Sequence, residues 1–195
     1  MEGWGLMKTA FIVFDRMTSL DFIGLYDPVT RLQSMKIMNE FEWRICAMAQ
    51  SVVDDRGLRM KANIVAKSLD CYDMVFVPGG YGTRTLRHDH EFIDWLKTAG
   101  SAWLKVSVCT GALLLGAAGF LRGRRATTHP SAYQELEPYC RSVIHDRVVD
   151  EGEVVTSSGV SAAIDLGLYI VQKLAGEEAR TRIATQMDYP CQWSP

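Results

Sequence analysis

Residues 104–119 read LKVSVCTGALLLGAAG, and this stretch predicts the fold around it. Leu104–Val108 is a short run typical of a buried strand, and Gly111–Gly119 is a run of small and apolar residues typical of a closely packed helix. Only Cys109 and Thr110 separate them. We therefore predict a strand that turns sharply into a helix, with Cys109 at the turn.

The rest of the chain repeats this alternation of strand and helix. We predict further strands at Thr9–Phe14, Glu42–Ala49 and Tyr72–Val77, hairpins within Val52–Ile64 and Val148–Val155, and helices at Leu20–Met35, Glu91–Ala99, Ser131–Glu137, Ala162–Leu174 and Glu177–Met187. Pro130 precedes the helix predicted at Ser131–Glu137, and Ser131 is its expected cap. Continuous apolar strands alternating with helices predict an α/β fold with a mostly parallel sheet covered on both faces.

Length and composition indicate one globular domain. The chain has 195 residues, of which 48% are hydrophobic and 23% charged, which excludes a disordered protein. We assign residues 8–195 to one domain and residues 1–7 to a flexible N-terminal extension. The net charge is only −2, so we expect no nucleic acid partner. The sequence shows no long apolar run and no signal segment, so we expect no membrane association and a cytoplasmic location.

The five cysteines are scattered, with no pair at the spacing of a zinc site. We therefore expect no metal and no disulfide framework. A cysteine between a strand and a helix projects above the sheet edge, much as the nucleophile turn of hydrolases presents serine. The start of the following helix should lower the pKa of the Cys109 thiol, which would favour a nucleophile. The alternative is a buried structural cysteine.

Three more positions face the same predicted edge of the sheet. The backbone N–H groups of Gly79 and Gly80 have the character of an oxyanion hole, although the pair could be a plain turn. Asp21 lies between apolar neighbours that should raise its pKa and suit it to proton transfer, unless it only caps a helix. His129 is either an accessory residue that orients the nucleophile or a structural histidine. Asp165 is interpreted as structural.

The chain resembles the ThiJ/PfpI superfamily, and within it the isocyanide hydratases, over residues 8–190. The segments that carry the resemblance are 20–24 (LDFIG), 77–80 (VPGG), 107–111 (SVCTG), 115–119 (LGAAG), 123–129 (GRRATTH) and 146–149 (DRVV). It implies a flavodoxin-like three-layer α/β sandwich. Leu25 departs from the hydratase pattern, which has proline after the glycine.

The resemblance also implies an activity. Cys109 would add to the terminal carbon of an isocyanide, Asp21 would handle the protons, and a thioimidate would be hydrolysed to an N-substituted formamide without a cofactor. Thr110, Gly79 and Gly80 would complete the site. Thr110 replaces the histidine that many proteolytic and amidase-like members carry. A homodimer acting on a small molecule is expected.

Three other functions remain open at this point. One is a glyoxalase or deglycase of the same superfamily, and another is an amidase-like hydrolase. The third is a non-catalytic regulator that senses oxidation or binds a ligand, for which no basic recognition helix is seen in the sequence. Trp43, Met48 and Tyr169 could form a subunit contact or belong to the core.

Overall fold

The computed structural model describes residues 6–190 and contains a central seven-stranded sheet. The strand order is β10-β11-β7-β6-β1-β2-β5, and every neighbouring pair is parallel except β10 with β11. The strands are β1 (Met7–Ile12), β2 (Phe41–Ala47), β5 (Ile64–Val65), β6 (Met74–Val77), β7 (Leu104–Val108), β10 (Val148–Asp150) and β11 (Val154–Ser157). Two small sheets pair β3 (Ser51–Val53) with β4 (Arg59–Lys61), and β8 (Arg125–Ala126) with β9 (Ser142–Val143).

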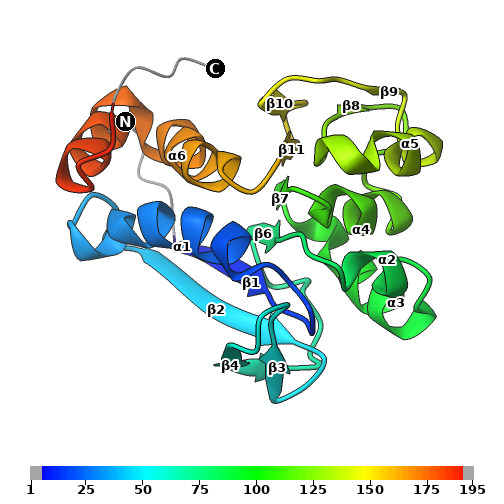
Figure 1. Cartoon of the computed structure of the whole chain (residues 1–195). Coiled ribbons are helices and arrows are strands. Elements are labelled where there is room, and N and C mark those ends of the chain that lie inside the picture. The colour runs from blue at the N-terminus through cyan, green and yellow to red at the C-terminus, as the bar shows by residue number, and fades with distance from the viewer. Residues whose placement is uncertain (1–5, 191–195) are drawn as a thin grey trace.

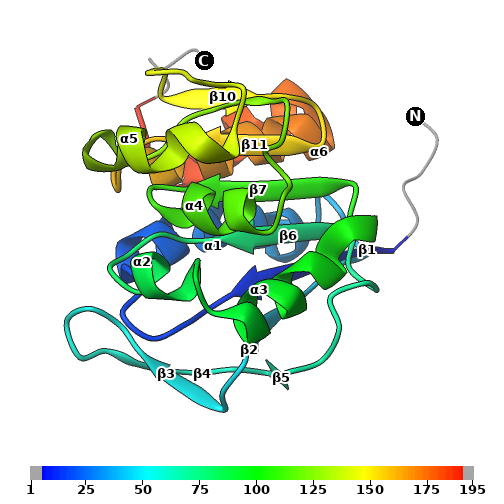
Figure 2. The same cartoon turned by 90° about the vertical axis from the view of Figure 1, so that its right-hand side faces the viewer.

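Helices cover both faces of the central sheet (Figure 1). One face carries α1 (Ser19–Ser34) and α6 (Ala162–Gln186); the other carries α2 (Thr83–Leu86), α3 (His90–Lys97), α4 (Gly111–Ala117) and α5 (Tyr133–Leu136), which stand in front of the sheet in Figure 2. Short 3-10 turns are η1 (Thr98–Ser101), η2 (Pro130–Ala132) and η3 (Glu137–Tyr139). The predicted three-layer, mostly parallel, flavodoxin-like fold is confirmed.

Most predicted elements agree with the structure, although α2, β5, β8 and β9 were not predicted. The helix expected at Ser131–Glu137 is broken into η2, α5 and η3, and the residue that caps η2 is His129 and not Ser131. The two helices predicted on either side of residue 176 are confirmed, because α6 consists of two helical segments that meet at Gly176, where the backbone is non-helical with φ at +87°. Finally, β1 begins at Met7, a residue that the prediction assigned to the N-terminal extension of residues 1–7. Residues 1–5 lie outside the part of the chain that the structure describes.

The two helices on one face approach each other closely. A Cβ atom placed on Gly24 of α1 would lie 2.6 Å from the Cβ of Ala163 in α6, and one on Gly167 would lie 2.4 Å from Cγ of Pro28. Pro28 therefore packs inside a continuous helix. This packing fixes α1, whose first turn carries Asp21.

Buried aromatic and aliphatic side chains fill the core on both sides of the sheet, and Phe11, Phe22 and Phe76 form edge-to-face contacts within it. Trp43, Met48 and Tyr169 are partly buried against this core. Within residues 6–190, no helix combines the length and apolar character that crossing a bilayer requires.

Candidate active site

The backbone at Cys109 adopts a strained conformation directly after β7. Its φ is +54°, a left-handed value that is uncommon outside glycine and costs about 1–3 kcal/mol. Three hydrogen bonds hold it: the Cys109 N–H donates to the carbonyls of Ser157 at 3.0 Å and Ser158 at 2.8 Å, and the Thr128 hydroxyl donates to the Cys109 carbonyl at 2.7 Å. The predicted sharp turn is therefore present, and Cys109 is 6% exposed.

Asp21 approaches Cys109 from the first turn of α1. It is fully buried, and its Oδ2 accepts a hydrogen bond of 3.0 Å from the Gly79 N–H. Its Oδ1 is buried too and receives no N–H or O–H hydrogen bond from residues 6–190. The N-cap position of α1 belongs to Thr18, so Asp21 does not cap the helix. Its carboxyl group is instead held beside the thiol, with which it interacts.

Gly79 and Gly80 position the other site residues. The Gly79 N–H donates to Asp21, and the Gly80 N–H donates to Oγ1 of Thr110 at 3.0 Å. Both N–H groups predicted to bind a substrate oxygen therefore have acceptors within the protein. A Cβ atom on Gly79 would lie 2.7 Å from the Cβ of Cys109 and 2.8 Å from Oδ2 of Asp21. Only glycine leaves room for the carboxyl and thiol groups to approach each other here.

Of the pKa values of Asp21 and Cys109, one differs from the sequence-based prediction. Burial raises the pKa of Asp21 to about 7, against the opposing effects of hydrogen bonds with Cys109 and the Gly79 N–H. Burial, followed by the charge of Asp21, raises the pKa of Cys109 to about 12, although a hydrogen bond from the Thr110 N–H lowers it. The raised pKa of Asp21 agrees with the prediction; the lowered pKa predicted for Cys109 is wrong, because desolvation outweighs the donors at the turn.

His129 lies on the same pocket but its Nδ1 is already engaged. Nδ1 accepts the Ser131 N–H at 3.2 Å and lies 2.8 Å from the Ser131 hydroxyl oxygen. Because Nδ1 is an acceptor, a neutral ring carries its proton on Nε2. The structure therefore gives His129 a capping role. Asp165 binds Arg147 and the Tyr189 hydroxyl, as a structural residue would.

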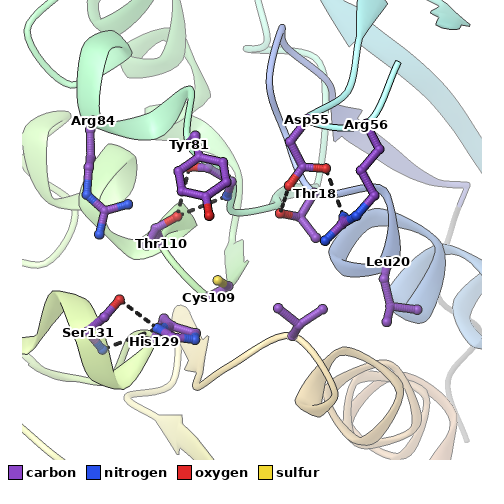
Figure 3. A pocket seen from close by; sticks show the side chains of 12 residues that line it. Thr18, Leu20, Asp55, Arg56, Tyr81, Arg84, Cys109, Thr110, His129 and Ser131 are labelled. Atoms are coloured by element: carbon purple, nitrogen blue, oxygen red, sulfur yellow. Dashed lines mark hydrogen bonds and ion pairs between the residues drawn. The ribbon is translucent and has the colours of Figure 1, made fainter. Parts of the chain in front are cut away.

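A pocket of about 290 Å³ opens above the thiol (Figure 3). Its lining comes from the strand ends and from the β3–β4 hairpin: Thr18, Leu20, Asp55, Arg56, Gly80, Tyr81, Arg84, Cys109, Thr110, His129, Ser131 and Val160. The pocket therefore combines charged and hydroxyl groups with apolar surface, to which Leu20, Tyr81 and Val160 contribute.

Sequence reasoning missed the walls of this pocket. The turn at residues 55–57 was recognisable, but nothing in the sequence shows that the hairpin folds over the sheet edge. The Thr18 hydroxyl donates to Oδ2 of Asp55 at 3.1 Å, and the Asp55 N–H donates to the Met17 carbonyl at 2.9 Å. Arg84 follows the Gly79-Gly80 turn closely in sequence. A basic residue so near the predicted site was the sequence signal that could have identified it as part of the pocket wall. No group of three or more His, Cys, Asp or Glu within residues 6–190 is arranged to hold a metal ion.

The fold and the turn define a flavodoxin-like α/β protein that presents a cysteine to a pocket at the carboxyl edge of its sheet. The family model described as the DJ-1/PfpI family matches residues 7–173, and the chain belongs to that family.

Three relatives illustrate its range. The chain is 34% identical to the isonitrile hydratase of Pseudomonas putida over 185 residues, which cover 94% of this chain and 78% of that protein. It is 29% identical to the glutathione-independent glyoxalase DJR-1.2 of Caenorhabditis elegans, with 68% of each chain covered. The crystal structure of a ThiJ/PfpI family protein from Pseudomonas syringae superposes with a TM-score of 0.85 at 28% identity, covering 98% of this chain and 77% of that one.

Proposed function

We propose that this protein is an isocyanide hydratase that converts an isocyanide and water into an N-substituted formamide. The observation that carries the proposal is the buried carboxyl group of Asp21, held by the Gly79 N–H beside the strained Cys109. The 34% identity to an isonitrile hydratase supports the same reaction.

The first step forms a thioimidate. The carboxylate of Asp21 accepts the thiol proton as the sulfur of Cys109 attacks the terminal carbon of the isocyanide. That proton then passes from Asp21 to the same carbon, which gives Cys–S–CH=N–R. One S–C bond forms, one S–H bond breaks, and Asp21 returns to its carboxylate form. A covalent intermediate divides a difficult hydration into two easier steps.

The second step releases the product. A water molecule gives a proton to Asp21 while its oxygen adds to the thioimidate carbon, and Asp21 passes that proton to the nitrogen. The C–S bond then breaks as the hydroxyl proton of the adduct passes to Asp21 and from there to the sulfur of Cys109, and the formamide R–NH–CHO leaves. The overall change is the addition of one water molecule, and no redox partner is needed.

The pKa values of the pair suit this sequence of proton transfers. A carboxyl group with a pKa of about 7 is substantially ionised near neutral pH and can still be reprotonated. A thiol with a pKa of about 12 keeps its proton until a base removes it during attack. The proposed enzyme therefore works with a thiol and an adjacent base, and it does not require a preformed thiolate.

The test is a hydration assay that follows formamide production from cyclohexyl isocyanide. Cys109→Ala should abolish turnover, and Asp21→Asn should lower kcat by about 10²–10⁴-fold, the usual contribution of a positioned acid or base. Cys140→Ala is the matched control, because Cys140 is half-buried outside the pocket lining. Full activity in Cys109→Ala would exclude the proposal.

A glyoxalase is the second candidate, because one relative carries that name at 29% identity. The same purified protein should be given methylglyoxal under the conditions of the isocyanide assay. Turnover of methylglyoxal that depends on Cys109, without turnover of any isocyanide, would favour this candidate.

A further inference from the structure

Arg84 is held at the wall of the pocket by a carboxylate on a neighbouring helix. Its Nε and Nη2 both bind Oε1 of Glu135 in α5 at 3.0 Å. Figure 3 shows its side chain extending from α2 toward the side of the pocket formed by Ser131 and His129. The guanidinium group is therefore oriented before any ligand arrives.

The charge around Arg84 is not balanced. Glu135 also binds Arg87, through Oε2 at 2.8 Å, so two guanidinium groups share one carboxylate. This cluster of Arg84, Arg87 and Glu135 has one excess positive charge, and only Arg84 among the three lines the pocket. The other arginine of the lining, Arg56, is paired with Asp55 at 2.9 Å and adds no net charge.

One edge of Arg84 remains available for a ligand. Its Nη1 has no acceptor among residues 6–190, and the side chain is 36% exposed. An arginine fixed on one edge by a protein carboxylate can donate from the other edge to a second carboxylate. Of the two carboxyl groups nearest the pocket, Asp55 is paired with Arg56, and Asp21 lies behind the lining, where it accepts the Gly79 N–H.

We infer that the substrate of this pocket carries a carboxylate, which Arg84 binds while the reacting carbon lies at Cys109. The inference rests on the proposed hydratase function and specifies its substrate class as isocyano carboxylates. The apolar Tyr81 and Val160 would then contact the part of the substrate between its two polar ends.

The experiment compares isocyanoacetate with its methyl ester, which share the isocyanide group and differ in charge. The wild type should have the higher kcat/KM for the acid. Arg84→Gln should lower the acid-to-ester ratio of kcat/KM by about 10–100-fold, mainly through KM, as expected for a lost hydrogen bond to a charged group. The acid-to-ester ratio of Arg84→Lys should lie between those of the wild type and Arg84→Gln, since lysine keeps the charge but lacks the planar guanidinium group. Arg87→Lys is the matched control and should keep the ratio, because it preserves the charge of the Arg84, Arg87 and Glu135 cluster at a residue outside the pocket lining.

A second measurement separates this inference from the proposed function. Binding of N-formylglycine and of its methyl ester to the wild type and to Arg84→Gln is followed by calorimetry, which needs no turnover. The inference is supported if the wild type binds N-formylglycine more tightly than its methyl ester and Arg84→Gln loses this preference. This result would stand even if neither isocyanide is hydrated and the hydratase proposal fails. Hydration of the ester with no preference for the acid in either measurement would overturn the inference and leave the hydratase proposal standing.

Discussion

Replacing Asp21 with asparagine should lower kcat by about 10²–10⁴-fold and yet stabilise the protein at alkaline pH. The pKa of Asp21 rises from 3.8 to about 7 on folding, because its carboxyl group is buried beside Cys109. A rise of this size corresponds to about 4 kcal/mol of folding free energy lost once the group is ionised. Asparagine keeps an oxygen that can accept the Gly79 N–H and carries no charge at any pH.

The sign of the effect follows from proton linkage. Between pH 4 and pH 7 the folded protein binds more protons at Asp21 than the unfolded chain does. The stability that comes from the protonated carboxyl group is therefore fully present below pH 4 and is lost as the pH rises through about 7. The stability advantage of Asp21→Asn over the wild type should grow by about 2–3 kcal/mol between pH 5 and pH 8.5, or by roughly 4–12 °C in Tm.

Urea unfolding of both proteins at pH 5 and pH 8.5, followed by circular dichroism, measures this difference. Groups that do not interact with Asp21 titrate alike in the two proteins and cancel, and pH 8.5 lies below the raised pKa of Cys109. Asp94→Asn is the control, because Asp94 is exposed and its pKa is lowered by Lys97, so its replacement should bring no such gain at pH 8.5. An advantage of Asp21→Asn that is the same at both pH values would refute the raised pKa and the mechanism built on it.

Two further predictions concern the same site. Gly79→Ala should lower kcat at least 10²-fold with little change in secondary structure, because the new Cβ would displace the carboxyl group of Asp21 and the Cβ of Cys109. A hydration assay together with circular dichroism measures both effects. Normal activity in this variant would contradict the prediction. The pH profile of kcat/KM should rise through about pH 7 as Asp21 loses its proton, and Asp55→Asn should move that rise to lower pH, because the charge of Asp55 helps to raise the pKa of Asp21. A rise placed near pH 9 would instead indicate ionisation of a free thiol.

The sequence was sufficient for features that depend on local pattern. The apolar run at Leu104–Val108 and the small residues after Gly111 predicted β7, the turn and α4, because strand and helix periodicities are visible within a few residues. The position of Asp21 near Cys109 followed from the rule that parallel strands present their carboxyl ends at one edge.

Other features depend on contacts between distant segments and could not be read from the pattern. The acceptors of the Gly79 and Gly80 N–H groups are Asp21 and Thr110, respectively, which lie 58 and 30 residues away in the chain. The pairing of Arg84 with Glu135 likewise spans 51 residues. Sequence reasoning therefore identified the residues of the site better than it identified which of them bind each other.

The pKa of Cys109 decides between two uses of the same thiol. A redox sensor needs a substantial thiolate fraction, because the thiolate is the form that peroxide oxidises. Because burial and Asp21 raise its pKa, Cys109 is mainly a thiol at neutral pH. The adjacent Asp21 compensates for the low thiolate content only in a reaction in which the thiol proton leaves while the sulfur attacks a bound substrate. The burial of this pair therefore supports the proposed catalytic use of the thiol.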